Sequence, residues 1–297
     1  MLFVNILLPV FLIIFAGYLL EKVAHLDFEA LTFCSLYLFT PALVFSALMK
    51  QTVHFHLALN IFLFMLLYTA TLLVLSVSAG RLLKMDPETR GALSLSTVMM
   101  NVGNFGLPLV YFAFGEKALN VSVLTFVLFL LPLGTLGIVL AQGAKAPLGK
   151  AILNSLKIPI FHAVILAFLL KILAIPFPRF LMRPIHLMGQ GAIPLMLVLL
   201  GMQLARTKLK AAPGFLSLAA GIRLAIAPLV AWGAAELLGI RGMTRDALIL
   251  QTSTPSAILP LLYSLRFGTR PDLVAGTILV TTLLSSASLT VILYLIH

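Results

Sequence analysis

Long apolar runs alternate with short polar gaps along the whole chain. A helix that crosses a bilayer needs about 20 mainly apolar residues. On that measure the pattern predicts ten spanning helices, at about 3–20, 31–49, 57–83, 88–114, 119–141, 153–174, 184–204, 213–238, 244–266 and 272–296. No gap is long enough to hold a folded soluble domain. The pattern therefore predicts an all-α integral membrane protein that crosses the bilayer many times.

The composition agrees with a membrane protein and decides how the positive charge is interpreted. Of the 297 residues, 61% are hydrophobic and 10% are charged, whereas a soluble domain has about 25% charged residues. The formal net charge of +11 comes from Lys and Arg in the gaps between apolar runs, which favours the positive-inside rule over nucleic-acid binding. Twelve of these residues fall in gaps on one side and seven on the other. The bias predicts a multi-pass protein of the cytoplasmic (inner) membrane, embedded in the lipid bilayer, with both termini outside.

The two halves of the chain resemble each other. LPLVYFAFG at 107–115 is similar to LPLLYSLRFG at 259–268, at an offset of 152 residues. RLLKMDPETRGALSL at 81–95 is similar to ELLGIRGMTRDALIL at 236–250, at an offset of 155. The similarity predicts two five-helix units, at 1–142 and 153–297. Because five is an odd number, the second unit would be inverted in the membrane, as in many transporters.

The fourth and ninth spans are interrupted at corresponding places. The fourth contains NVGNFGLP at 101–108, and the ninth contains TSTPS at 252–256 with Pro260 beyond. Glycine permits unwound backbone, and proline removes a hydrogen-bond donor. Backbone groups freed in this way must face protein or a water-filled cavity, and helix starts exposed there favour anions. We therefore expect a substrate or ion site where the two breaks cross, with interhelical packing as the alternative role of its polar residues.

Both breaks resemble those of one transporter family. NVGNFGLPL is similar to the fourth span of the auxin efflux carrier family, and TSTPSAILPLLYSLRFG is similar to that family's ninth span. Bacterial members are often described as permeases for malate, malonate or similar carboxylates. The resemblance implies a scaffold of spans 1, 2, 6 and 7, a transport domain of spans 3–5 and 8–10, elevator-like movement and a homodimer through the scaffold. The substrate-binding residues that it implies are Asn101, Gly103, Asn104, Ser253, Thr254, Pro255 and Ser256. Gly103 departs from the family pattern, because it aligns with the proline of the second break.

The sequence gives little support for a coupling ion. The more distant bile acid:sodium symporters share the ten-span plan and carry an acidic residue in the ninth-span break. All nine acidic residues of this chain lie at or near the ends of spans, so no midplane carboxylate is predicted. A weak sodium site of hydroxyls and carbonyls remains open, with Ser122 or Thr125 as contributors, as does coupling to protons. No cofactor is predicted.

Arg223 is the one basic residue that the pattern places well inside a span, about ten residues from its start. Two roles are open for it: attraction of an anionic substrate, or capping of carbonyl groups in a broken helix.

These patterns predict a secondary carrier of small organic anions, either auxin-like or malate- and malonate-like carboxylates. A sodium-coupled symporter of organic anions is the alternative. An intramembrane enzyme is disfavoured, because the GxSxG and HExxH motifs and paired intramembrane aspartates do not occur. A ligand-sensing receptor on the same fold is disfavoured, because the sequence contains no signalling domain.

Overall fold

The computed structural model describes residues 2–50, 55–142, 149, 156–207 and 212–296. Within these ranges the chain is helical and forms no β-strand. The elements, with η for π-helical segments, are η1 (Phe3–Leu7), α1 (Leu8–Ala24), α2 (Phe28–Cys34), η2 (Ser35–Phe39), α3 (Thr40–Lys50), α4 (Phe55–Leu82), α5 (Pro87–Val98), η3 (Val102–Gly106), α6 (Leu107–Gln142), α8 (Pro159–Ile172), α9 (Arg179–Arg206), α10 (Pro213–Gly221), η5 (Ile222–Ile226), α11 (Ala227–Leu237), α12 (Gly242–Thr252), α13 (Leu259–Phe267) and α14 (Pro271–Ile296).

Seven of the described helices are long and apolar enough to cross a membrane, compared with the ten spans that the hydrophobic pattern predicts. Three predicted spans account for the difference. The ninth is divided into α12 and α13, the sixth is represented by the 14-residue α8, and the fourth and fifth share α6. The protein is an all-α, multi-pass membrane protein, and the ten-span inverted repeat stays a prediction.

α6 consists of two helical segments joined at Gly115. This residue has φ 75° and ψ −167°, outside the helical region. A side chain would be strained at that positive φ, whereas glycine adopts it readily. The kink falls between the predicted end of the fourth span at 114 and the predicted start of the fifth at 119. Glycine thus permits a change of direction where the hydrophobic pattern places a short gap.

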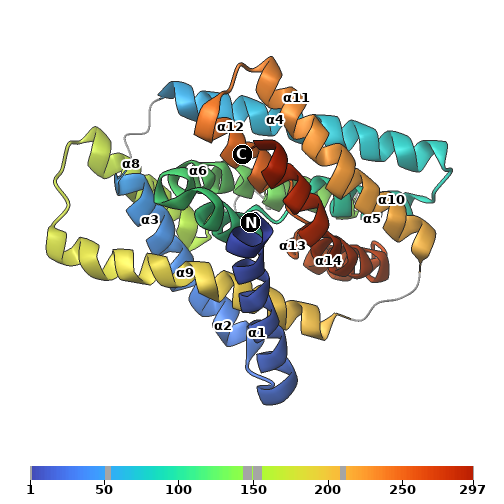
Figure 1. The fold of residues 1–297 in the computed structure, drawn as a ribbon, viewed down its shortest axis with the longest axis horizontal. Coiled ribbons are helices and arrows are strands. Elements are labelled where there is room, and N and C mark those ends of the chain that lie inside the picture. Colours follow the sequence, from blue (N-terminus) through green and yellow to red (C-terminus); the bar gives the residue numbers. More distant parts are fainter. Residues whose placement is uncertain (1, 51–54, 143–148, 150–155, 208–211, 297) are drawn as a thin grey trace.

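The helices pack in two groups (Figure 1). In the first group α1 lies against α9, and α3 lies against both α8 and α9. In the second group α12 packs against α6 and α11, α11 packs against α4, and α14 packs against α5 and α10. η3 contacts α9, and α6 contacts α3 and α9. These two elements therefore form much of the boundary between the groups.

α1 and α9 approach each other until their backbones touch. A Cβ atom added to Gly201 would lie 1.9 Å from the carbonyl oxygen of Ile14. One added to Gly17 would lie 2.2 Å from the carbonyl oxygen of Val198. Small residues allow this kind of close helix packing in membranes. Glycine at both positions therefore fixes the crossing of the two helices.

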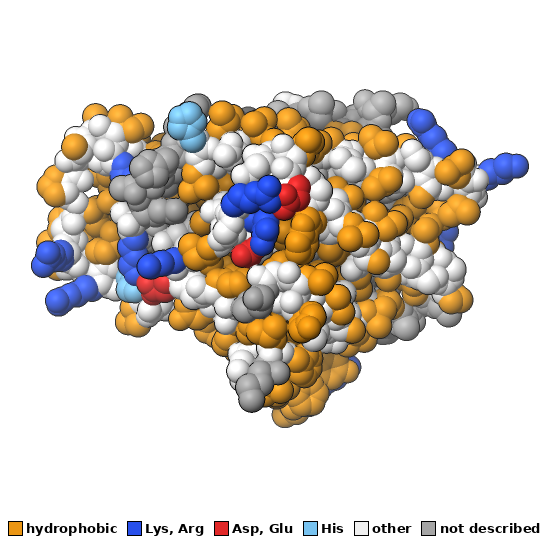
Figure 2. Space-filling model, turned by 45° about the horizontal axis from the view of Figure 1, so that its top comes forward, with side chains coloured by type: hydrophobic (Ala, Val, Ile, Leu, Met, Phe, Trp, Pro, Cys, Tyr) orange, Lys and Arg blue, Asp and Glu red, His pale blue; other side chains and the backbone are white. Residues whose placement is uncertain are grey.

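Large hydrophobic side chains cover much of the molecular surface (Figure 2). Exposed examples on α1 and α14 are Leu12, Phe15, Val291 and Tyr294. Apolar area of this extent is unfavourable in water, so these faces suit contact with acyl chains. Lys and Arg side chains gather in small groups in the same view, as expected when charge is confined to the ends of spanning helices.

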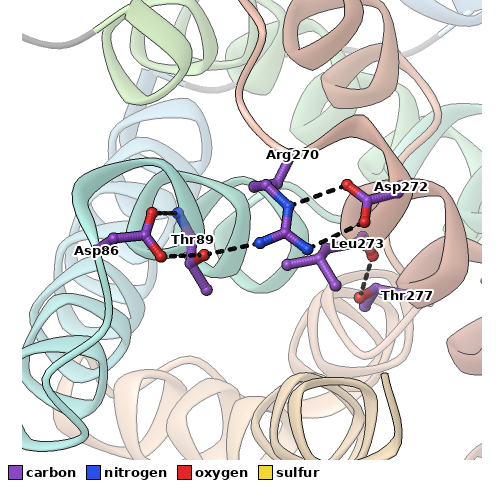
Figure 3. A network of polar contacts seen from close by, with 6 residues as sticks. All are labelled: Asp86, Thr89, Arg270, Asp272, Leu273 and Thr277. Atoms are coloured by element: carbon purple, nitrogen blue, oxygen red, sulfur yellow. Dashed lines mark hydrogen bonds and ion pairs between the residues drawn. The ribbon is translucent and has the colours of Figure 1, made fainter. Parts of the chain in front are cut away.

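Arg270 ties the start of α5 to the start of α14 (Figure 3). Its guanidinium donates to the two carboxylate oxygens of Asp272 at 3.2 and 3.1 Å, and to Thr89 Oγ1 at 3.4 Å. Asp86 caps α5 by accepting from Thr89 N at 2.9 Å and from Thr89 Oγ1 at 2.7 Å. The hydrogen bonds from Thr89 lower the pKa of Asp86 from its ordinary value of 3.8. The hydrogen bonds to Asp272 raise the pKa of Arg270.

Some residues used in the sequence analysis lie outside the described part of the chain. Lys145, Lys150, Lys208 and Lys210 contribute to the predicted positive-inside bias and belong to these segments. Positions 153–155, where the sixth span and the second unit are predicted to begin, do so as well.

Candidate substrate site

The two breaks, between α5 and η3 and between α12 and α13, cross and are hydrogen-bonded to each other. The amide of Asn101 donates to the carbonyl of Pro255 at 2.9 Å. The amide of Ala257 donates to the carbonyl of Met99 at 2.8 Å. An isolated antiparallel β-bridge pairs Met100 with Ser256, between these two hydrogen bonds. The unwound segments thus satisfy each other's backbone groups, as the interior of a membrane protein requires.

Each break leaves carbonyls without their helical donors, and one of them in each break occupies a corresponding position. In a continuous helix the carbonyl of Thr97 would accept from the amide of Asn101, but that amide is bound to the other break. The carbonyl of Thr252 would likewise accept from the amide of Ser256, which instead donates to Thr281 Oγ1 at 3.2 Å. Both carbonyls therefore need a donor from elsewhere in the fold.

Arg223 supplies that donor to both carbonyls. It lies in η5 and its side chain is fully buried. Its Nη1 donates to Thr97 O at 3.0 Å, and its Nη2 donates to Thr252 O. Nη2 also donates to the hydroxyl of Tyr68 at 2.7 Å, and that hydroxyl donates to Thr252 O at 2.8 Å. Of the two roles that the sequence leaves open for Arg223, these contacts correspond to the capping of broken helices.

A cavity of about 320 Å³ lies against the crossing. α2, η2, α3, α8 and α9 line one part of it, and the two breaks with η3, α6 and α13 line the other. Most of the lining is aliphatic or aromatic. Among the described residues that line it there is no Lys, Arg, His, Asp or Glu. The polar lining side chains are Thr32, Ser35, Tyr37, Thr40, Asn101, Asn104 and Gln203.

Three of the predicted substrate-binding residues line this cavity: Asn101, Gly103 and Asn104. Asn101 is 6% exposed, and its Nδ2 group has no hydrogen-bond partner within the described part of the chain. An unpaired buried donor costs about 1–3 kcal/mol. A ligand would remove that cost if the Asn101 side chain turned its amide toward an acceptor in the cavity.

The predicted residues of the second break do not line the cavity. The hydroxyls of Ser253, Thr254 and Ser256 donate to the carbonyl oxygens of Ile249, Gln251 and Ser96, at 2.6, 2.8 and 2.6 Å respectively. Pro255 contributes the carbonyl that binds the first break. Ala257, Ile258 and Leu259 line the cavity in their place. The polar groups of the second break thus stabilise the crossing and do not contribute to the cavity lining.

Gln251 connects the first break to α6. Its side chain is fully buried, and Nε2 donates to the carbonyls of Val102 and Ser122, both at 3.0 Å. Gly106 leaves room for it, because a Cβ there would lie 2.9 Å from Gln251 Cγ. Both weak sodium candidates lie nearby. Ser122 supplies one of these carbonyls, and its own buried hydroxyl has no hydrogen-bond partner among the described residues. Thr125 Oγ1 donates to the carbonyl four residues earlier at 3.0 Å. No group of three His, Cys, Asp or Glu that could hold a metal occurs among the residues described.

The hydrophobic pattern does not reveal the side of the cavity that η2 and its neighbours line. Thr32 and Thr40 line the cavity, and each hydroxyl is buried with no hydrogen-bond partner in the described ranges. The sequence feature that could have drawn attention to this region is Pro41, which follows Thr40 in the middle of the predicted second span. η2 is itself π-helical, and such segments often occur at functional sites. Gln251 was not predicted either, because the pattern does not reveal which carbonyls lie opposite its amide.

A smaller cavity, of about 30 Å³, lies toward the opposite ends of the same helices. Along α9 it is lined at 186–193, whereas the large cavity is lined at 196–203. Lys50 Nζ lies 3.5 Å from Glu116 Oε2 and 3.2 Å from His186 Nε2 at this end. The two cavities therefore differ in size and lie at different levels along the helices that they share.

Known proteins resemble this chain along its whole length. A family model described as membrane transport protein matches residues 2–148 and 144–293. An "Uncharacterized transporter" of Methanothermobacter thermautotrophicus is 24% identical over 286 residues, which cover 95% of this chain and 94% of that protein. A Rhizobium meliloti protein named "Putative malonate transporter" is 27% identical over 311 aligned positions, which cover 99% of this chain and 95% of that protein.

A third relative matches a shorter stretch. An "Uncharacterized transporter" of Methanocaldococcus jannaschii is 28% identical over 210 residues, which cover 68% of this chain and 67% of that protein. The family match extends over both breaks and agrees with their resemblance to the auxin efflux carriers. The chain therefore belongs to the membrane transport protein family that includes the auxin efflux carriers.

Proposed function

We propose that this protein is a secondary transporter of small organic anions, and that the substrate binds in the cavity beside the crossing. The observation that carries the proposal is Asn101, which lines the cavity and whose buried Nδ2 group has no hydrogen-bond partner among the described residues. A carboxylate is an acceptor-only group and complements such a donor. Asn104 offers a second side-chain amide in the same wall.

The local field also favours an anion. The helix that begins with η3 and the helix α13 both start at the cavity, and each helix start carries about half a positive elementary charge. The negative ends belong to α5 and α12, where Arg223 binds the exposed carbonyls. No acidic side chain lines the cavity among the residues described. These features favour a bound carboxylate over a bound cation.

A carboxylate substrate also fits the lining. Phe28, Tyr37 and Phe126 lie in the cavity wall and would accept the apolar body of an auxin-like acid. The name of the Rhizobium meliloti relative points to malonate. Both belong to the class of small carboxylates, and the class is what we propose.

Access would alternate by elevator-like movement of one helix group against the other. The cavity lies at the boundary between the first group (α1–α3, α8 and α9), as the scaffold, and the second group, as the transport domain. With the N-terminus outside, the large cavity would open toward the cytoplasm and the small one would lie on the outer side. A homodimer through the first group belongs to the same proposal.

The proposed transport is independent of sodium. The carbonyls of Val102 and Ser122 could coordinate a cation, but both accept hydrogen bonds from Gln251 Nε2. An amide that already binds these oxygens favours anion transport without sodium over sodium-coupled symport.

Currents from proteoliposomes on a solid-supported membrane test the proposal. Malonate, malate, short monocarboxylates and indole-3-acetate would be added in turn, first without sodium and then with it. We expect current without sodium, reduced about tenfold or more in Asn101→Ala and Asn104→Ala, because each loses a hydrogen bond to a charged ligand. Asn60→Ala is the matched control, because it removes the same group from an exposed position on α4.

Two results would contradict the proposal. A current that requires sodium would favour the symporter. Transport that survives both cavity substitutions would place the substrate elsewhere. Uptake of radiolabelled ligand would be measured in parallel, so that electroneutral exchange is also detected.

A further inference from the structure

Arg223 is a buried charge that is not paired with a carboxylate. None of the ion pairs among the described residues includes it. Its partners are the carbonyls of Thr97 and Thr252 and the hydroxyl of Tyr68. A cation inside a membrane protein is costly and usually marks a pathway for charge. Helix capping explains its hydrogen bonds but leaves its full positive charge to be accounted for.

The crossing holds about one net positive charge. Each of its four helix ends contributes about half an elementary charge. The two ends that Arg223 caps are negative and the two that start at the cavity are positive, so their contributions cancel. The guanidinium charge remains. Since the described lining of the cavity has no charged side chain, a ligand with one negative charge would make the loaded crossing neutral.

We propose that Arg223 sets the net charge of the bound ligand at minus one. This inference rests on the proposed function and deepens it. A monocarboxylate satisfies the condition as its ordinary anion. A dicarboxylate satisfies it only as the hydrogen form, with one carboxyl group protonated, because a second charge would stay uncompensated where water is scarce. Arg223 does not line the cavity, so it acts through the field of the two breaks rather than by contact.

Malonate and monomethyl malonate make a matched pair of ligands for the test. They share a skeleton, but the ester carries a single negative charge throughout the neutral pH range. Their affinities for the purified full-length protein would be measured from ligand-induced rises in Tm between pH 5 and pH 8. Above the second ionisation of malonate we expect its affinity to fall about tenfold per pH unit, while that of the ester stays constant. An affinity for malonate that stays constant or rises with pH would overturn the inference.

Substitutions of Arg223 separate its charge from its capping role. Arg223→Lys keeps the charge and should keep the pH dependence of malonate binding. Arg223→Gln keeps donors but removes the charge, and should weaken binding of monomethyl malonate about tenfold or more relative to neutral dimethyl malonate. A purely structural role would lower the Tm of Arg223→Gln without changing that ratio, and would overturn the inference. If Arg223→Gln does not fold, the ligand pair on the unmodified protein decides.

The same data distinguish this inference from the proposed function. Binding with the expected charge preference, but without uptake or current, would support the charge rule and contradict transport. Failure of every carboxylate to raise Tm or to be taken up would contradict the proposed function and the charge rule together.

Discussion

Thr97 and Thr252 lie in the last turns of α5 and α12 and make the same contacts. Each hydroxyl donates to the carbonyl four residues earlier at 2.7 Å, and each carbonyl is bound by Arg223. The two residues are 155 positions apart, the offset that also relates 81–95 to 236–250. The inverted repeat stays a prediction, and this correspondence supports it at the place where the two units would meet.

Asn101→Asp tests the sign of the ligand charge. The substitution keeps the size of the side chain but places a negative charge in the cavity wall. We expect it to abolish carboxylate binding more completely than Asn101→Ala, by about a further factor of ten. Ligand-induced changes in Tm would measure the difference. If Asn101→Asp bound carboxylates as well as the unmodified protein, the cavity would not be an anion site.

Gln251→Glu is expected to create a requirement for a cation. A carboxylate would replace the amide that donates to the carbonyls of Val102 and Ser122, so three oxygens would face each other without a donor. We expect a loss of about 1–3 kcal/mol in stability, seen as a lower Tm that sodium partly restores. Gln251→Leu is the control, because it loses the same hydrogen bonds but gives sodium no new ligand. Equal sodium effects on both variants would contradict the expectation.

Gly201→Ala is expected to separate α1 from α9. The added methyl group would lie 1.9 Å from the carbonyl oxygen of Ile14, and overpacking of this kind costs about 1–3 kcal/mol. Gly233→Ala in α11 is the matched control, because an added Cβ there meets nothing within 4 Å. We expect Gly201→Ala to lower Tm and Gly233→Ala to leave it unchanged or raise it. Similar Tm values for the two variants would contradict the backbone contact.

Asp86 is expected to make stability depend on pH in the acid range. Its pKa is lowered in the folded protein by the hydrogen bonds from Thr89. Its stabilising effect is therefore complete above the unfolded pKa and is lost as pH falls through the lower folded value. Asp86→Asn keeps an acceptor for the cap but does not titrate. The Tm advantage of the unmodified protein over Asp86→Asn should shrink as pH falls below about 4, and a constant difference would contradict this.

Glycine and proline made the two breaks predictable from sequence. They interrupt apolar runs at 101–108 and 252–260. The second break lies there, at 253–258, whereas the first lies at 99–101, directly before the glycines of η3 and the proline of α6. Asn101, Gly103 and Asn104, which the resemblance to the family picks out, line the cavity beside the first break. The number of long helices was less predictable. A broken, a short or a kinked span satisfies the hydrophobic pattern as well as a straight helix does.

The far wall of the cavity could not be predicted. Thr32 and Thr40 resemble any threonine in a membrane helix until the fold places a break opposite them. Ser253 and Thr254 are the opposite case, because they are predicted to bind substrate but do not line the cavity. Their hydroxyls can bind either a ligand or a carbonyl of their own helix, and the local bond is always within reach. Only the packed structure decides between these two outcomes.

The hydrogen bonds between Asn101 and Pro255, and between Ala257 and Met99, hold the two unwound segments together as one rigid unit. Neither unwound segment can straighten or bend without breaking bonds to the other. If the protein switches access, the deformation has to fall in the connections between the two helix groups, far from the bound ligand. The part of the binding site that the two breaks form would then keep its shape and charge on both sides of the membrane.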